Sequence, residues 1–381
     1  MNITIDIRCL MHPNYSGVGE YAFNLLNNLF QIDDQNDYQL FFNAKQDVSP
    51  ILPPFNFPNV KFYGFNYPNK LFNFSLSFLR TPKLDRLIPN MDIFFAPNLN
   101  FAALTGKTKK IITVHDLSFE FYPHFFSVKR QLWHKFIKPK KLIDSFDRII
   151  AVSKNTKNDL VDLYHIPSEK IKIIYSGIDH NLYQPLDKND LKFKQLKNRY
   201  QLPEKFILFL GTLEPRKNVT GIIEAFNLLK ANYPQFSDLF LIIAGEKGWH
   251  FEKIFELAKN SPFTKQIFYL DYINRQEKPL LYNLAEIFIF PSFYEGFGFP
   301  ALEAQACGLP VIASANSSFS EILGASAFLV NPDHIEELAS SLYQILSNQE
   351  LRQGLVNKGL ENSQRFSWDK CAKETLDYIL N

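Results

Sequence analysis

Short apolar segments of strand length recur along the chain and alternate with segments of helical periodicity. Between the first two strands, for example, Tyr21, Leu25 and Leu29 share one helical face. Strands that alternate with helices indicate a parallel sheet covered by helices on both faces. The strands expected in the first half are residues 3–8, 38–42, 60–65, 92–96, 111–114 and 148–152.

The alternation restarts after a polar, proline-containing region, Asp179 to Glu204, which we interpret as a domain junction. We therefore predict two doubly wound α/β domains, residues 1–180 and 181–365, and a C-terminal helix in 366–381. Ligands of such sheets bind beyond the carboxyl ends of the strands. The strands expected in the second half are residues 206–210, 239–244, 267–270, 287–290, 310–313 and 327–330.

Composition narrows the functional classes. A length of 381 residues favours two domains. The net charge of +2 gives no electrostatic case for binding nucleic acid. The three cysteines are widely spaced and suit the reducing cytoplasm rather than a disulfide framework or a zinc site. Because no apolar run approaches 18 residues, we expect any contact with the cell membrane to be peripheral.

Segment 127–143 is both basic and apolar. It carries six Lys or Arg residues among Leu132, Trp133 and Phe136, and it has no acidic residue. Such a segment can lie on the anionic inner face of a cell membrane. The alternative is an ordinary surface helix that buries one face, and residues 71–87 leave the same two interpretations open.

A glycine-bearing loop between the strand expected at 287–290 and a following helix carries two carboxylates. Glu295 precedes Gly296 and Gly298, and Glu303 lies eight residues after Glu295, inside the expected helix. Glycines permit close approach of a ligand, and free amides at a helix start bind anions. The pattern favours a ligand with anionic and hydroxyl parts, such as a sugar nucleotide. The alternative is a loop with two solvated glutamates.

Two adjacent cations follow the strand expected at 206–210. Arg216 and Lys217 precede Asn218, which we expect to cap the next helix. Cations at a helix start face an unfavourable dipole unless an anion joins them, so this pair favours a diphosphate. The alternative is a pair of solvated side chains.

Two features of the first domain also follow strands. His115 comes directly after the strand expected at 111–114, where active-site groups gather, although a lone histidine is more often structural. Residues 17–22 fit the pattern G-x-G-x-x-A. A dehydrogenase is disfavoured, because residues 9–16 separate the pattern from its strand and Asn43 stands where an acidic residue is expected. We interpret Gly17 as part of a loop that approaches a phosphate, or as a plain loop–helix junction.

The motifs together resemble those of a known family. Glu295-Gly-Phe-Gly-Phe-Pro-Ala-Leu-Glu303 is similar to the E-x7-E motif of the retaining GT-B glycosyltransferases of family 4, also called glycosyl transferases group 1. The stretches 211–218 and 113–117 look most like those of bacterial mannosyltransferases that build surface polysaccharide. The resemblance implies two Rossmann-like domains that face a central cleft and a C-terminal helix that crosses back to the first domain.

The resemblance also implies residue roles. Glu295, His115 and Lys217 would act at the reaction, with Glu295 and His115 at the transferred sugar. Glu303 would bind the donor ribose, and Tyr272 and Ile273 would flank the nucleobase. The other donor contacts would come from Gly17, Arg216, Lys217, Gly296, Phe297, Gly298 and Phe299. Thr212 departs from the pattern, because many relatives have an arginine there, and Ser16 stands where many have a glycine.

The implied reaction is transfer of a hexose, with mannose from GDP-mannose favoured, to a glycan or a lipid-linked saccharide. No DxD pair follows a strand, so we expect neither a metal nor another cofactor. Three alternatives stay open: a UDP-sugar donor carrying glucose, galactose or GlcNAc, a GT-B-like nucleotide-sugar epimerase, and a non-catalytic nucleotide-sugar-binding protein.

Overall fold

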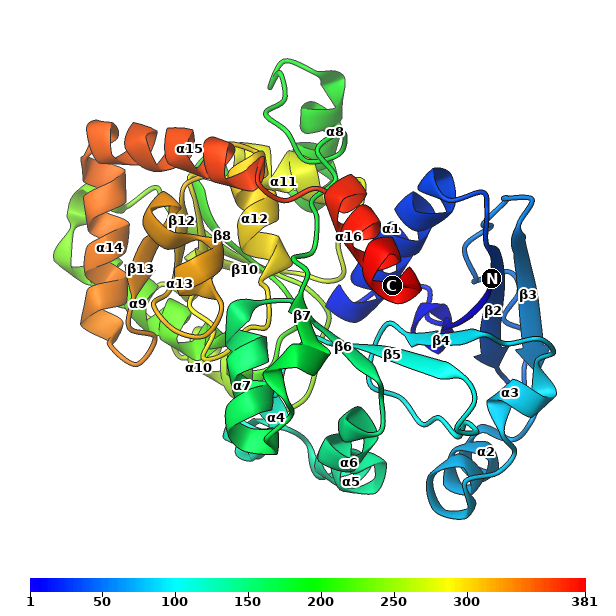
Figure 1. Cartoon of the computed structure of the whole chain (residues 1–381). Coiled ribbons are helices and arrows are strands. Elements are labelled where there is room, and N and C mark those ends of the chain that lie inside the picture. Colours follow the sequence, from blue (N-terminus) through cyan, green and yellow to red (C-terminus); the bar gives the residue numbers. More distant parts are fainter. The chain divides into compact units, whose positions relative to one another are not determined.

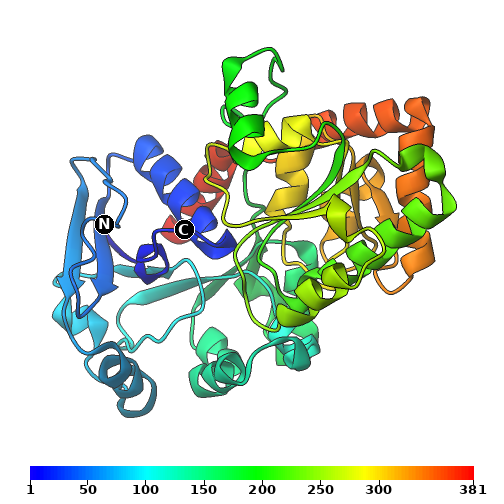
Figure 2. The same ribbon diagram turned by 180° about the vertical axis from the view of Figure 1, so that it is seen from behind.

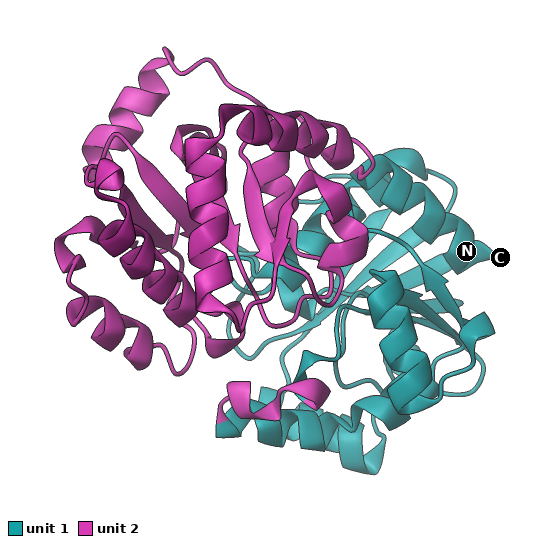
Figure 3. Cartoon of the chain, turned by 90° about the vertical axis from the view of Figure 1, so that its left-hand side faces the viewer, with its two compact units in different colours: residues 1–119, 128–177, 368–381 teal, residues 120–127, 178–367 magenta.

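The strands form two separate sheets, and every neighbouring pair of strands is parallel. The computed structural model describes residues 1–381 and divides them into two units (Figure 1, Figure 3). Unit 1 comprises Met1–Phe119, Val128–Gly177 and Trp368–Asn381, and unit 2 comprises Glu120–Ser127 and Ile178–Ser367. The predicted α/β class is confirmed.

Unit 1 contains a seven-stranded sheet with the order β3-β2-β1-β4-β5-β6-β7. Its strands are β1 (Asn2–Asp6), β2 (Asp37–Asn43), β3 (Val60–Phe65), β4 (Ile93–Ala96), β5 (Lys109–Val114), β6 (Arg148–Ala151) and β7 (Ile171–Ile173). Its helices are α1 (Gly17–Ile32), α2 (Asn69–Phe74), α3 (Leu84–Leu87), α5 (Val128–Ile137), α6 (Pro139–Asp144), α7 (Lys154–Tyr164) and α16 (Trp368–Leu380). A π-helical turn, η2 (Ser75–Leu79), continues α2, and α4 (Ser118–Phe121) spans the point where the chain leaves unit 1.

Unit 2 contains a six-stranded sheet with the order β10-β9-β8-β11-β12-β13. Its strands are β8 (Phe206–Leu210), β9 (Phe240–Ala244), β10 (Ile267–Leu270), β11 (Ile287–Phe290), β12 (Val311–Ser314) and β13 (Phe328–Val330). Its helices are α8 (Leu191–Tyr200), α9 (Val219–Asn232), α10 (Glu252–Lys259), α11 (Lys278–Leu284), α12 (Phe299–Ala306), α13 (Phe319–Ile322), α14 (Ile335–Ser347) and α15 (Gln349–Ser363).

The central strands carry the cores of both units. All residues of β4, β8, β11 and β12 are buried, as expected for strands covered by helices on both faces. The order of strands reverses between β1 and β4 in unit 1 and between β8 and β11 in unit 2. A crevice for a ligand forms at such reversals, beyond the carboxyl ends of the strands. In unit 2 that position is the loop after β8 and the loop after β11.

The C-terminal helix belongs to unit 1, as predicted. It lies beside α1, and both views show the red and blue helices side by side (Figure 1, Figure 2). The Trp368 ring lies 6.0 Å from the Tyr21 ring, and Lys109 donates a hydrogen bond to the carbonyl of Ile379. The last residues of the chain therefore complete the core of the unit in which the chain begins.

Candidate functional site

Three loops meet at the carboxyl edge of the unit 2 sheet. Residues 211–218 follow β8, 291–298 follow β11 and 315–318 follow β12. Because β11 pairs with both β8 and β12 in parallel, the three loops emerge beside one another. The loops that the sequence separates by about 80 residues are thus brought to one place.

An ion cluster joins the first two loops. The Lys217 Nζ atom lies 2.5 Å from Glu295 Oε1, and Arg216 Nη1 lies 3.1 Å from the same oxygen. Arg216 Nη2 lies 2.6 Å from Glu214 Oε1. All four side chains are largely buried, with Lys217 9% exposed and Glu295 7% exposed. The structure therefore brings together three residues that the sequence analysis assigned to donor binding and catalysis.

Backbone hydrogen bonds hold Glu295 in this cluster. Arg216 Nη1 donates to the carbonyl of Tyr294 at 2.6 Å, and the carbonyl of Arg216 accepts from the Phe293 amide at 2.9 Å. The third loop completes the support, because Ser317 Oγ accepts from the Glu295 amide and Ser318 Oγ donates to the Glu295 carbonyl. The loops after β8 and β12, the two strands beside β11, therefore both hold Glu295 in place.

The pKa values of the pair reflect two opposing effects. Burial alone would raise the pKa of Glu295, but Arg216 and Lys217 outweigh it and hold that pKa below its usual range. Burial, helped by Arg216, lowers the pKa of Lys217, and Glu295 opposes this effect. Glu295 is therefore an ionised carboxylate at neutral pH.

The glycine loop presents free backbone donors at the start of α12. The amides of Gly296, Phe297 and Gly298 donate no hydrogen bond within the protein. Gly298 caps α12 with φ +90°, and a Cβ atom at this position would lie 2.3 Å from the Phe319 ring. Glycine is thus required by both backbone angle and space, and the loop can offer its amides to an anion.

Glu303 lies within α12 and is also buried. Its Oε2 atom accepts a hydrogen bond of 2.9 Å from the Tyr282 hydroxyl, whose residue belongs to α11. Its Oε1 atom makes no hydrogen bond within the protein. One carboxylate oxygen of Glu303 is therefore fixed and the other is left for a ligand.

Asn218 caps α9, as predicted. It adopts φ +54°, and its Oδ1 atom accepts from the Gly221 amide at 3.3 Å. Its Nδ2 atom donates to the carbonyl of Pro332 at 2.7 Å. The cap ends the short 3-10 turn Pro215–Lys217 and so fixes where the two cations lie.

Two predicted site residues belong to unit 1. His115 follows β5, and its Nε2 atom donates to the carbonyl of Pro97 at 2.9 Å. Burial lowers the pKa of His115, so its imidazole is neutral at neutral pH. The Tyr21 ring contacts it edge-on at 4.7 Å. Gly17 is the first residue of α1 and is exposed. Their assigned roles at the donor remain predictions.

Tyr272 and Ile273 follow β10, as the sequence analysis expected. Tyr272 is 36% exposed, whereas Ile273 is buried. Strand β9 separates β10 from β8 in the sheet, so the two residues lie along the same carboxyl edge as the cluster but two strands away. Their assignment to the nucleobase stays a prediction.

Several residues of this region were not predicted from the sequence. Tyr282 and the serines at 317 and 318 orient the two glutamates, and the buried Asn316 Oδ1 atom has no hydrogen-bond partner. The polar run 314–318 directly after an expected strand was a usable signal. Nothing in the local pattern around Tyr282 indicated its partner.

An aromatic segment, residues 120–127, packs beside the glycine loop within unit 2. Phe121 stacks on Tyr294 with ring centroids 5.5 Å apart, and Phe125 lies 5.2 Å from Phe293. Trp249 donates its indole hydrogen to the carbonyl of Phe125. The segment thus covers the residues that directly precede Glu295.

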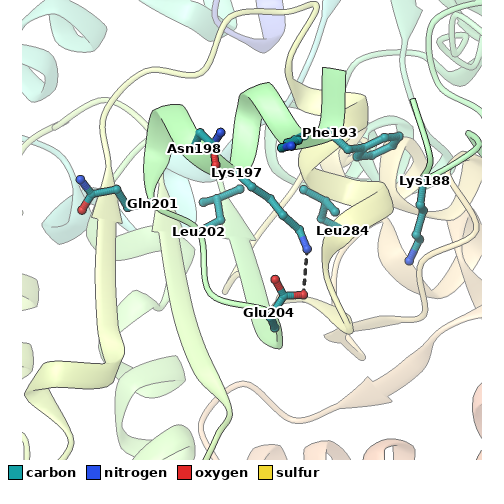
Figure 4. A pocket seen from close by; sticks show the side chains of 9 residues that line it. Lys188, Phe193, Lys197, Asn198, Gln201, Leu202, Glu204 and Leu284 are labelled. Atoms are coloured by element: carbon teal, nitrogen blue, oxygen red, sulfur yellow. Dashed lines mark hydrogen bonds and ion pairs between the residues drawn. The ribbon is translucent and has the colours of Figure 1, made fainter. Parts of the chain in front are cut away.

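A cavity of about 820 Å³ in unit 2 lies away from this site (Figure 4). Leu202 and Glu204 precede β8, and Leu284 precedes β11, so this cavity opens at the amino edge of the sheet. Its other lining residues come from α8 and the loops on either side of it, and an ion pair of 2.9 Å joins Lys197 to Glu204. The cavity contains none of the predicted site residues.

Two further features of the structure concern metal binding and membrane insertion. No three His, Cys, Asp or Glu side chains are grouped so that they could hold a metal ion. None of the helices combines the length and the apolar character that a membrane span requires. The prediction of a metal-free reaction remains untested by this observation.

Comparison with known proteins decides the family. Residues 15–182 match the model of Glycosyltransferase Family 4, and residues 190–362 match that of Glycosyl transferases group 1. The chain is a family 4 glycosyltransferase. It is 29% identical to O-antigen chain mannosyltransferase B of Escherichia coli, over 71% of this chain and 69% of that protein. It is 30% identical to the serotype-specific mannosyltransferase WbdA of Escherichia coli, over 59% of this chain but 28% of WbdA.

The fold of the glycosyltransferase also has solved counterparts. Sucrose-phosphate synthase from Thermosynechococcus elongatus superimposes with a TM-score of 0.78 at 19% identity, covering 99% of this chain and 98% of the other. The two Rossmann-like sheets and the returning helix α16 identify the GT-B architecture. The predicted fold and the predicted enzyme class are both confirmed.

Proposed function

We propose that this glycosyltransferase transfers mannose from GDP-mannose to a glycan or a lipid-linked saccharide, with retention of configuration and without a metal. The observation that carries the proposal is the buried cluster of Lys217, Arg216 and Glu295 beside the free amides of the glycine loop. Mannose is favoured because both relatives named above are mannosyltransferases.

The cations and amides suit the departure of a nucleoside diphosphate. When the bond between the anomeric carbon and the diphosphate oxygen breaks, negative charge grows on the leaving phosphate. Lys217 and Arg216 supply positive charge in a site that largely excludes water, where it acts more strongly than in solution. The amides of Gly296 and Gly298 and the start of α12 add fixed donors.

Glu295 suits a positioning role at the sugar better than that of a nucleophile. Two cations hold its carboxylate, so that attack on carbon would have to break both ion pairs. We assign the attack to the acceptor hydroxyl, which approaches the face that the diphosphate leaves. The acceptor oxygen forms the new bond to the anomeric carbon, and its proton passes to the departing phosphate oxygen.

The remaining residues have proposed binding roles. The free Oε1 atom of Glu303 is suited to accept a hydrogen bond from a ribose hydroxyl. We assign Tyr272 and Ile273 to the nucleobase, Gly17 to the diphosphate and the neutral imidazole of His115 to the transferred sugar. These four assignments rest on the family resemblance.

A transfer assay with excess chelator tests the proposal. We expect GDP release from GDP-mannose that depends on added saccharide acceptor, continues in chelator and forms a glycoside with the donor's anomeric configuration. Isomerised nucleotide sugar without acceptor would show an epimerase, and donor binding without product would show a binding protein. Turnover of UDP-sugars alone would overturn the choice of donor, and restoration of lost activity by Mn²⁺ would overturn the metal-free reaction.

A further inference from the structure

Helix α5 turns its apolar stripe toward solvent. Val128, Leu132 and Phe136 follow one another at intervals of four residues and are 72%, 49% and 48% exposed. Ile137 is the only buried residue among the ten of this helix. An ordinary surface helix would point this stripe at the core. Helix α5 therefore buries Ile137 but presents its apolar stripe to solvent.

The turn η2 and the helix α2 present a second exposed apolar stripe. Leu71, Phe74, Phe78 and Leu79 are each about half exposed or more, whereas Phe72 and Leu76 between them are buried. The buried pair anchors the segment to the core. The outward side chains consequently stay in water although they are as apolar as the anchors.

The two stripes form one continuous surface within unit 1. The Phe78 ring lies 5.8 Å from the Phe136 ring and 4.9 Å from the Phe74 ring. Ser77 Oγ donates to the carbonyl of Phe136 at 3.2 Å, and the Lys138 ammonium lies 5.5 Å from the centre of the Phe78 ring. We call this surface, made of residues 70–83 and 128–141, the apolar–basic face.

A cationic cavity opens in the apolar–basic face. It measures about 150 Å³ and is walled by apolar residues such as Leu76, Phe101 and Ile137. No acidic residue lines it. Its charged lining consists of Arg80, Lys83, Lys110, Lys138 and Lys141.

Positive charge is concentrated on this face. Segments 70–83 and 128–141 together carry nine Lys or Arg residues and no Asp or Glu. Since the whole chain has a net charge of only +2, the rest of the chain is net acidic. The local field of the face is therefore far stronger than the overall charge indicates.

We propose that the apolar–basic face docks on an anionic lipid bilayer and that its cavity receives the phosphate of a lipid headgroup. Exposed aromatic and leucine side chains enter the boundary between headgroups and acyl chains, while lysines contact anionic headgroups. The five cations of the cavity match a phosphate that carries apolar chains, because apolar residues surround them. Docking through this face does not depend on which sugar donor the enzyme uses.

A nucleic acid is disfavoured as the occupant of this face. Leu71, Leu79 and Val128 have no flat ring on which a base could stack. The exposed rings of Phe74, Phe78 and Phe136 pack against one another. An acyl-chain boundary accommodates such side chains, whereas a phosphate backbone does not. RNA is accordingly included in the test as a competing ligand.

Vesicle flotation of the full chain tests docking. We expect the partition coefficient to be at least tenfold higher for phosphatidylcholine vesicles that contain one quarter phosphatidylglycerol than for pure phosphatidylcholine, and to fall in 0.5 M NaCl. The double variant Leu132→Ser, Phe136→Ser should lose about tenfold in partitioning. Leu191 of unit 2 is 72% exposed and lies outside the apolar–basic face. The variant Leu191→Ser should therefore bind vesicles like the wild type.

Charge-matched variants test the cavity. Lys138→Gln with Lys141→Gln should weaken binding roughly 25-fold, at about fivefold for each basic residue. Lys129→Gln with Lys140→Gln removes the same charge outside the cavity and should weaken binding less. Equal losses in the two pairs would overturn the headgroup site.

Three results would overturn docking itself. These are equal binding to both kinds of vesicle, wild-type binding by the Leu132→Ser, Phe136→Ser variant when its circular dichroism is unchanged, and tighter binding to a 20-nucleotide RNA than to the anionic vesicles.

Discussion

Lys217 and Glu295 are 78 positions apart in the sequence, yet Lys217 Nζ lies 2.5 Å from Glu295 Oε1. The two residues meet because β8 and β11 are parallel neighbours and each residue follows one of these strands. This ion pair joins the loop proposed to hold the diphosphate to the loop proposed to hold the sugar.

Removing either partner should lower both stability and activity. Lys217→Met or Glu295→Gln leaves the other side chain buried with one fewer partner, which should cost about 3 kcal/mol in the free energy of unfolding. Transfer should fall at least about a hundredfold, as it does when a group that stabilises transition-state charge is removed. Urea unfolding and initial rates measure the two effects.

A double-mutant cycle checks that the two residues act together. The variant with both changes should lose less stability than the two single losses added, because no unpaired charge remains. Lys205→Ala breaks the exposed ion pair with Asp238 and should leave the unfolding curve nearly unchanged. Additive losses for Lys217→Met and Glu295→Gln would contradict the assignment.

Low pH should lower the stability of unit 2, because Glu295 becomes protonated. The cations keep the folded-state pKa of Glu295 below its unfolded value of 4.5, so the stability it contributes is present above that pH. The contribution is lost as pH falls below 4.5 toward the folded-state pKa. Glu295→Gln, measured by urea unfolding between pH 7 and pH 3, should lose less stability below pH 4.5 than the wild type does. Parallel curves would show that Glu295 does not titrate in this way.

Gly298→Ala should destabilise the protein more than the same substitution at Gly324. Both Gly298 and Gly324 have positive φ, but a Cβ would clash with the Phe319 ring only at Gly298. We expect Gly324→Ala to lose about 1 kcal/mol and Gly298→Ala at least about 2 kcal/mol.

Gly354→Ala serves as a control for the Gly298 and Gly324 variants, because it should raise stability instead of lowering it. Gly354 lies inside α15 with open space around it, so the change should stabilise the protein by about 0.5–1 kcal/mol. Thermal unfolding of the three variants tests the order. Equal losses for Gly298→Ala and Gly324→Ala would show that Phe319 moves aside freely.

Tyr282→Phe should weaken donor binding, although Tyr282 is assigned no contact with the donor itself. The Tyr282 hydroxyl fixes one carboxylate oxygen of Glu303, and its loss leaves that buried oxygen without a donor. We expect a cost of about 1–3 kcal/mol in stability and a higher KM for the donor with kcat less affected. An unchanged KM would indicate that Glu303 needs no orientation.

Much of the fold follows from the sequence, because strands buried on both faces are continuous apolar runs. β8 and β11 illustrate this, since every residue of each is apolar and buried. The missed strand β7 is only three residues long, Ile171–Ile173, and its middle residue is a lysine. Such a short edge strand depends on pairing with β6 rather than on its own pattern.

Residues of the site could be predicted only where a local sequence pattern marks their position. Glu295, Lys217 and Gly298 follow expected strands or start expected helices, so their positions at one edge could be inferred. The hydrogen bond from Tyr282 to Glu303 joins two helices and has no sequence pattern. Likewise, the periodicity of α5 describes a stripe but not whether that stripe faces the core or the solvent.

The most direct measurement is a thermal-shift titration of the wild type and of Glu303→Gln with nucleoside diphosphates and nucleotide sugars. GDP-mannose at about 100 times its Kd should stabilise the wild type by about 2.7 kcal/mol, and Tm should rise by several degrees. Glu303→Gln should lose most of that rise, and UDP-glucose should give a smaller shift to the wild type. The account would be contradicted if no nucleotide sugar or nucleoside diphosphate raised the Tm, or if Glu303→Gln responded like the wild type.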